Sequence, residues 1–142
     1  MINQSLLDTF GNKLKKSSAY ISGSTGKGAN YFHKVAETGG IDSSAPYVGE
    51  SYDAAALMLL AMASAKSSDP QVYKDHIMQV ANGPGEKIYP GELGKGIKLA
   101  SYGVAIDYVG ASSVSLIGPG EAAGNFREIE IQNGKMVDVN YR

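Results

Sequence analysis

Cysteine is absent from this sequence of 142 residues. Its absence excludes disulfides and every function that uses a thiolate, including metal sites with cysteine ligands. A large excess of charge of one sign is absent as well, because the formal net charge is −1. The strongest basic cluster is the short run at residues 13–16. We therefore expect neither nucleic acid nor an anionic membrane surface as a partner.

Long hydrophobic runs are also missing. The longest apolar run, residues 54–63, is too short to cross a bilayer and predicts a buried helix instead. No basic segment followed by an apolar stretch stands at the N-terminus, so no signal peptide is visible. Hydrophobic residues make up 43% of the chain and charged residues 19%, a composition typical of a folded domain rather than of a disordered one.

The residue sets that usually carry catalysis are not apparent. His33 and His76 are the only histidines, they lie in different predicted helices, and no carboxylate stands at metal-ligand spacing around either. Glycine-rich stretches at residues 23–28 and 91–96 lack the Lys-Ser or Lys-Thr ending of a phosphate loop and predict flexible connections. We expect no metal, no cofactor and no enzymatic activity.

Helical periodicity dominates the first two thirds of the chain. The pattern predicts helices at about 5–10, 29–37, 48–66, 70–81 and 93–102. Two signals fix boundaries: Gly39 and Gly40 end the second helix, and Pro70 begins the fourth. The helix at 48–66 is apolar on nearly all sides in its middle, so it needs cover from more than one direction.

Extended structure is predicted mainly near the C-terminus. Candidate strands are residues 19–21, 106–108, 114–116, 126–131 and 136–139. Residues 126–131 alternate apolar and polar side chains, as a half-buried strand does. Asn133-Gly134 is a strong hairpin turn signal. The expected fold class is α/β, helix-rich with a terminal β-hairpin.

Two features precede or open the long helix. Glu50 and Asp53 are one helical turn apart, so both can face one side, where paired carboxylates could exchange protons. Acidic residues near the start of a helix more often suit its dipole, and we favour that interpretation. Tyr47 stands directly before the helix, where a stiff aromatic ring can form a pocket wall at low entropic cost.

The segment from Tyr47 to Tyr52-Asp53-Ala54 resembles the helix start of periplasmic substrate-binding proteins of the branched-chain amino-acid type, which reads aromatic-x-x-x-x-Tyr-Asp-Ala. Further segments are similar in the same order, and the resemblance covers about residues 1–139; they are Ser67-Ser68-Asp69-Pro70, residues 81–85, residues 106–112, Gly120-Glu121 and the final hairpin. Two departures are Ser113, where many members have glycine, and residues 116–118, where Phe-Asp is usual.

The resemblance implies the C-terminal part of a type I periplasmic-binding fold, which has two α/β lobes joined by a hinge. Residues 1–22 would belong to the second lobe, residues 23–117 would supply first-lobe helices, and residues 118–142 would return through the hinge to the terminal hairpin. The implied function is that of the solute-binding component of an ABC transporter in the periplasm. An amino-acid-like small molecule and the ABC permease would be its partners, and hinge closure its mechanism.

The resemblance also implies a site. Tyr47 matches the aromatic position that covers the apolar side chain of the ligand in that family. Glu50 and Tyr52 are weaker ligand-binding candidates, and Tyr52 also suits a packing role. A competing interpretation is that Tyr47 only packs against the helix start.

Two other functions stay open. A ligand-sensing domain of a signalling protein can share the same two-lobed fold, and a free-standing interaction module could reuse this part of it. The chain offers little sheet to cover the long apolar helix, and exposed apolar surface drives association. We therefore expect a homo-oligomer, held together through residues 52–66 or by exchange of the C-terminal hairpin.

Overall fold

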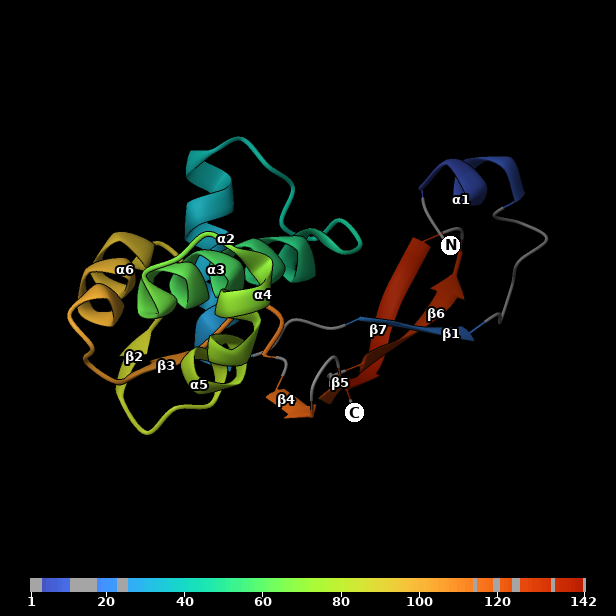
Figure 1. Cartoon of the computed structure of the whole chain (residues 1–142). Helices are drawn as coiled ribbons and strands as arrows, with labels where there is room; N and C mark the ends of the chain where they lie inside the picture. Colours follow the sequence, from blue (N-terminus) through green and yellow to red (C-terminus); the bar gives the residue numbers. More distant parts are fainter. Residues whose placement is uncertain are drawn as a thin grey trace. The chain divides into compact units, whose positions relative to one another are not determined.

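The computed structural model describes residues 4–10, 18–22, 26–113, 115–118, 121–123, 126–133 and 135–141. It is a mixed α and β structure that divides into two compact units (Figure 1). The terminal unit combines Met1–Gly23 with Asn125–Arg142, and the central unit is Ser24–Gly124. The chain thus passes from one unit to the other twice. The resemblance to the substrate-binding family implied the corresponding changes at 22/23 and 117/118.

The terminal unit contains a three-stranded antiparallel sheet. Its elements are α1 (Gln4–Phe10), β1 (Ser18–Ser22), β6 (Phe126–Gln132) and β7 (Lys135–Tyr141), with strand order β1-β6-β7. The predicted hairpin is confirmed, since Gln132 pairs with Lys135 and Asn133 has a φ of 52° at the turn. Ile129 and Ile131 are buried on one face, as the alternation predicts.

The helices of the central unit follow the predicted pattern closely. They are α2 (Gly26–Thr38), α3 (Val48–Ala65), α4 (Pro70–Tyr73), the 3-10 turn η1 (Lys74–His76), α5 (Ile77–Ala81) and α6 (Leu93–Ser101). Pro70 opens α4 as predicted, and the carboxylate of Asp69 caps it by accepting from the Gln71 amide at 2.9 Å.

Two helix predictions need correction. In the two glycine-rich stretches predicted as flexible connections, Gly26 to Gly28 belong to α2 and Leu93 to Gly96 belong to α6. The helix predicted from Pro70 onward is interrupted by η1, although no glycine or proline marks a break there. His76 Nδ1 lies 2.9 Å from Ser64 Oγ of α3, so a tertiary contact accompanies the interruption. Residues 23–25, Val114, Gly120 and Gly134, which also carried predictions, lie outside the described residues.

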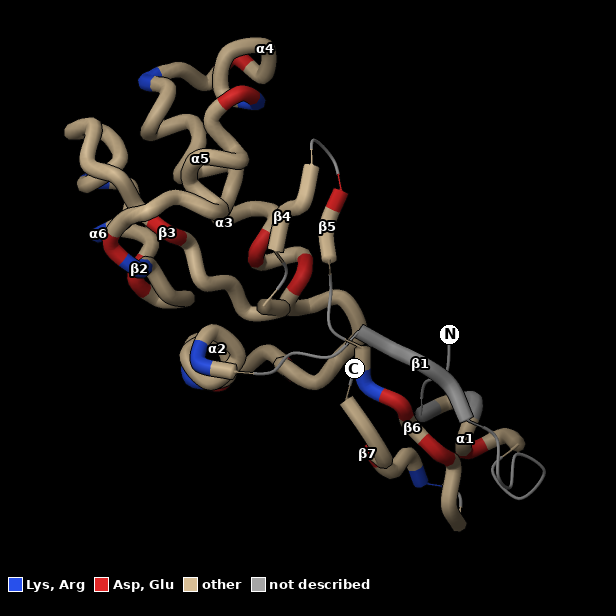
Figure 2. Tube along the Cα trace, turned by 90° about the horizontal axis from the view of Figure 1, so that it is seen from below, with Lys and Arg blue, Asp and Glu red and all other residues tan. Residues whose placement is uncertain are grey.

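The described residues of the central unit also form four short strands. Strand β2 (Glu86–Ile88) runs parallel to β3 (Ile106–Tyr108), and α6 connects them as a β-α-β unit. Figure 2 shows both signs of charge on this pair, and Lys87 and Asp107 form a salt bridge at 2.8 Å. Strand β4 (Ser115–Gly118) pairs antiparallel with β5 (Glu121–Ala123).

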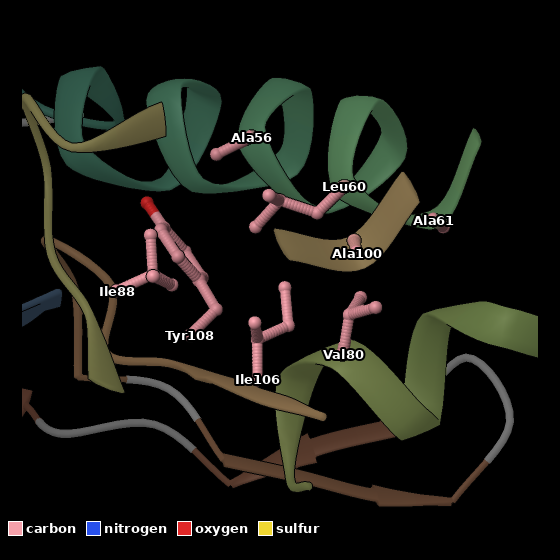
Figure 3. Packing of buried hydrophobic residues seen from close by; sticks show 8 residues of the cluster. All are labelled: Ala56, Leu60, Ala61, Val80, Ile88, Ala100, Ile106 and Tyr108. Atoms are coloured by element: carbon pink, nitrogen blue, oxygen red, sulfur yellow. The ribbon is translucent and has the colours of Figure 1, made fainter. Parts of the chain in front are cut away.

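The main core forms under α3. Ala56, Leu60 and Ala61 of α3 are fully buried, and they meet side chains from β2, β3, α5 and α6 (Figure 3); these are Ile88, Ile106, Tyr108, Val80 and Ala100. A Cβ at Gly96 of α6 would lie 2.8 Å from Leu60 Cδ2, so α6 approaches α3 where no side chain intervenes. The apolar helix is therefore covered on more than one side, as its pattern required.

One strip of α3 stays uncovered. Met58 is 41% exposed and Leu59 46%. The expected self-association through this helix stays a prediction. Met58 and Leu59 are the exposed apolar side chains of α3 that we expect a second copy to contact. Among the helices of the described residues, none is long and apolar enough to cross a membrane.

Candidate functional site

The residue before α3 has an unusual backbone. Tyr47 is the N-cap residue, with φ 65° and ψ 5°, in the left-handed region that bulky residues rarely adopt. Such a conformation costs on the order of 1–3 kcal/mol and persists only where the surroundings hold it. The Tyr47 side chain makes no capping hydrogen bond and is 58% exposed. The structure thus presents this predicted ligand residue as an exposed ring on a strained backbone.

Tyr52, the second aromatic candidate, is engaged in packing. Its ring centroid lies 5.2 Å from that of Phe32 in α2. Its hydroxyl accepts a hydrogen bond from the Gly91 amide at 3.1 Å. Tyr52 therefore connects α3 with α2 and with the loop that precedes α6.

The side chain with the most connections at this end of α3 is Asp53. Its Oδ1 accepts from the Tyr108 hydroxyl at 2.8 Å and from the Ala111 amide at 2.7 Å. Its Oδ2 accepts from the amide and the hydroxyl of Ser112, at 2.7 and 2.5 Å. All four partners donate, so the carboxyl group acts only as an acceptor, in the manner of a carboxylate. One side chain thus attaches α3 to the segment that follows β3.

This cluster is withdrawn from water. Asp53 is 7% exposed and Ser112 3%. In Figure 3 the hydroxyl of Tyr108 points toward α3. Burial raises the pKa of Tyr108 far above its ordinary value, and the negative charge and hydrogen bond of Asp53 act in the same direction. The phenol therefore keeps its proton and remains a donor to Asp53.

Two glycines allow this close approach. A Cβ at Gly110 would lie 2.5 Å from Asp53 Oδ2, so a side chain there would displace the carboxylate. A Cβ at Gly28 would lie 1.9 Å from the Gly110 carbonyl oxygen, so α2 also packs directly on this backbone. The segment after β3 is thereby held between α2 and α3.

A cavity of about 280 Å³ adjoins the cluster within the central unit. Its walls come from α3, from the end of α5, from β3 and the segment after it, and from the β4–β5 hairpin; the lining residues are Glu50, Asp53, Ala54, Leu57, Ala81, Tyr108, Gly110, Ser112, Leu116 and Ala122. Glu50, a predicted ligand residue, is half-buried and lines it, whereas Tyr47 and Tyr52 do not.

The two carboxylates therefore face one side of α3 but differ in role. Glu50 lies in the first turn, where the helix dipole favours a negative charge. Asp53 is better explained by its four donors than by the dipole, a role that sequence reasoning missed. The available signal was an acidic residue among alanines and leucines on a helix that must be covered, since a buried charge requires donors.

No metal site is evident in the part of the chain that the structure describes, where no three His, Cys, Asp or Glu side chains form a group able to hold an ion. His33 contacts Ser43, and His76 contacts Ser64.

No family model matches this chain, and comparisons with curated proteins and with solved structures found no match.

The contrast between the two carboxylates gives a first prediction. Asp53→Asn leaves one acceptor oxygen and turns an NH2 group toward buried donors, so we expect it to lower the free energy of unfolding by about 2–4 kcal/mol. Glu50→Gln, one turn away, should change it by less than about 0.5 kcal/mol. Urea unfolding at pH 7 measures both. Equal and small effects would show that Asp53 does not hold the segment after β3.

The raised pKa of Tyr108 gives a second prediction. Because the folded phenol keeps its proton while the unfolded one ionises near the ordinary tyrosine pKa of 10.0, this contribution to stability is complete below pH 10 and declines above it. Tyr108→Phe should lower stability at pH 7 and flatten its decline at higher pH. Tyr102→Phe, at a side chain 74% exposed, should do neither. Unfolding curves from pH 8 to 11 test this, and parallel declines in all three proteins would contradict it.

Proposed function

We propose that this chain is part of the solute-binding component of an ABC transporter, which captures an amino-acid-like solute by closing two lobes around it. The observation that carries the proposal is the pairing of two segments. Tyr52-Asp53-Ala54 and Gly110-Ala111-Ser112 lie in two of the ordered segments that carry the resemblance. They are joined by the hydrogen bonds of Asp53, across 58 and 59 residues of sequence.

The architecture supports the same proposal. The central unit contains a parallel β-α-β element with helices packed against it, as α/β lobes do. The chain passes between two compact units at residues 23/24 and 124/125. Hinge closure moves two compact units about a few residues in the segments that connect them, and these two connections can serve that role.

Backbone conformation adds two details. Ser113 stands where many members of that family have glycine, and its φ of 53° is in the region that glycine adopts most easily. Tyr47 has a strained backbone and an exposed ring, and strain of this kind is concentrated at ligand contacts and switch regions. In the proposed function Tyr47 covers the apolar part of the solute, Glu50 lies close to it, and Tyr52 supports the helix.

The proposal is tested on the full-length product of the reading frame that contains these residues. Titration calorimetry with a panel of free amino acids should find one or more that bind with micromolar affinity. Small-angle scattering should show compaction when the solute is added. A folded protein that binds no amino acid would contradict the proposal.

Tyr47→Ala in the same protein should weaken solute binding by about 1–3 kcal/mol, because it removes an apolar wall. Its midpoint of thermal unfolding should change little. Tyr102→Ala, which removes an exposed ring elsewhere, should leave affinity unchanged. Unchanged affinity with lowered thermal stability in Tyr47→Ala would instead assign Tyr47 to the packing of the helix start.

A further inference from the structure

The cavity beside Asp53 has the dimensions and walls of a small-molecule site. Its volume of about 280 Å³ is close to the lower end of the range of about 300–1,000 Å³ that is typical of ligand pockets. Leu57, Leu116 and Ala122 face it from α3 and from the β4–β5 hairpin. Walls of this kind bind an apolar group better than they bind water.

The charged residues that line the cavity are all acidic. Glu50 and Asp53 line it, and none of its lining residues is Lys, Arg or His. The oxygens of Asp53 already accept four hydrogen bonds. Glu50 has no ion-pair partner among the described residues, and its side chain is half-buried. Glu50 is therefore the group in the cavity with a free charge.

We propose that this cavity binds a small primary ammonium ion with a short apolar tail. The ammonium group donates to Glu50, and the tail packs against Leu57 and Leu116. A ligand that also carries a carboxylate is disfavoured, because its negative charge would lie near both Glu50 and Asp53. The site lies in the central unit and shares Glu50 with the ligand candidates of the proposed function, whereas Tyr47 and Tyr52 do not line it.

Two probes that differ mainly by one carboxylate separate these cases: 3-methylbutylamine and leucine. Each is titrated into the 142-residue chain and followed by 1H–15N NMR. The amine should give saturable shifts in the amides of Ala111, Ser112 and residues 50–57, with a dissociation constant of about 0.1–3 mM for so few atoms. Leucine should bind at least about tenfold more weakly.

Variants test the role of Glu50. Glu50→Gln should weaken amine binding by about tenfold or more while the spectrum stays that of a folded chain. Glu37→Gln removes an exposed carboxylate of α2 and should leave affinity unchanged. Ala122→Leu should fill the cavity and reduce binding in the same way.

Three results would overturn the proposal: no saturable shift with about 10 mM amine in a folded chain, equal binding of leucine and the amine, or equal weakening by Glu50→Gln and Glu37→Gln. None of these results affects the amino-acid titration of the full-length protein. Failure of that titration, in turn, leaves amine binding by the central unit unaffected.

Discussion

The buried carboxylate of Asp53 is the interaction on which the central unit depends. A carboxylate in an apolar interior is strongly unfavourable unless donors replace the water that it loses. Here two backbone amides and two hydroxyls do so, at 2.5–2.8 Å. All of these donors come from Tyr108 and the segment after it. The need of the Asp53 carboxylate for hydrogen-bond donors therefore fixes the path of a backbone segment that is distant in the sequence. The same contact forms one wall of the cavity, and its tight geometry accounts for glycine at Gly110 and Gly28.

Much of the fold was predictable because its signals are local. Periodicity, Pro70 and the pair Gly39-Gly40 fixed the helices of the central unit to within a few residues, and alternation fixed the terminal hairpin. Strands β2 (Glu-Lys-Ile) and β5 (Glu-Ala-Ala) were missed because neither alternates apolar and polar residues, as the equally short β3 (Ile-Asp-Tyr) does. The interruption at η1 was missed because no breaker marks it, and it coincides with the contact between His76 and Ser64.

The site was predictable only in part. The spacing of Glu50 and Asp53 put both carboxylates on one side of α3, and both do line the cavity. Which of them is buried depends on donors more than fifty residues away, and no local pattern contains that information. The left-handed backbone conformation of Tyr47 could not be predicted either. The sequence shows an aromatic residue before a helix, but it does not show the φ angle of that residue. The assignment of Tyr47, Glu50 and Tyr52 to ligand binding stays a prediction.

Hydrogen exchange at the amides of Ala111 and Ser112 tests the central claim most directly. Both donate to Asp53 in a segment with little regular structure, and their protection depends on that carboxylate. In the 142-residue chain we expect both amides to exchange within about tenfold of the rate of the core amide of Leu60, since opening the cluster should require opening the unit. Exchange as fast as that of an unstructured peptide would show that Asp53 does not hold this segment.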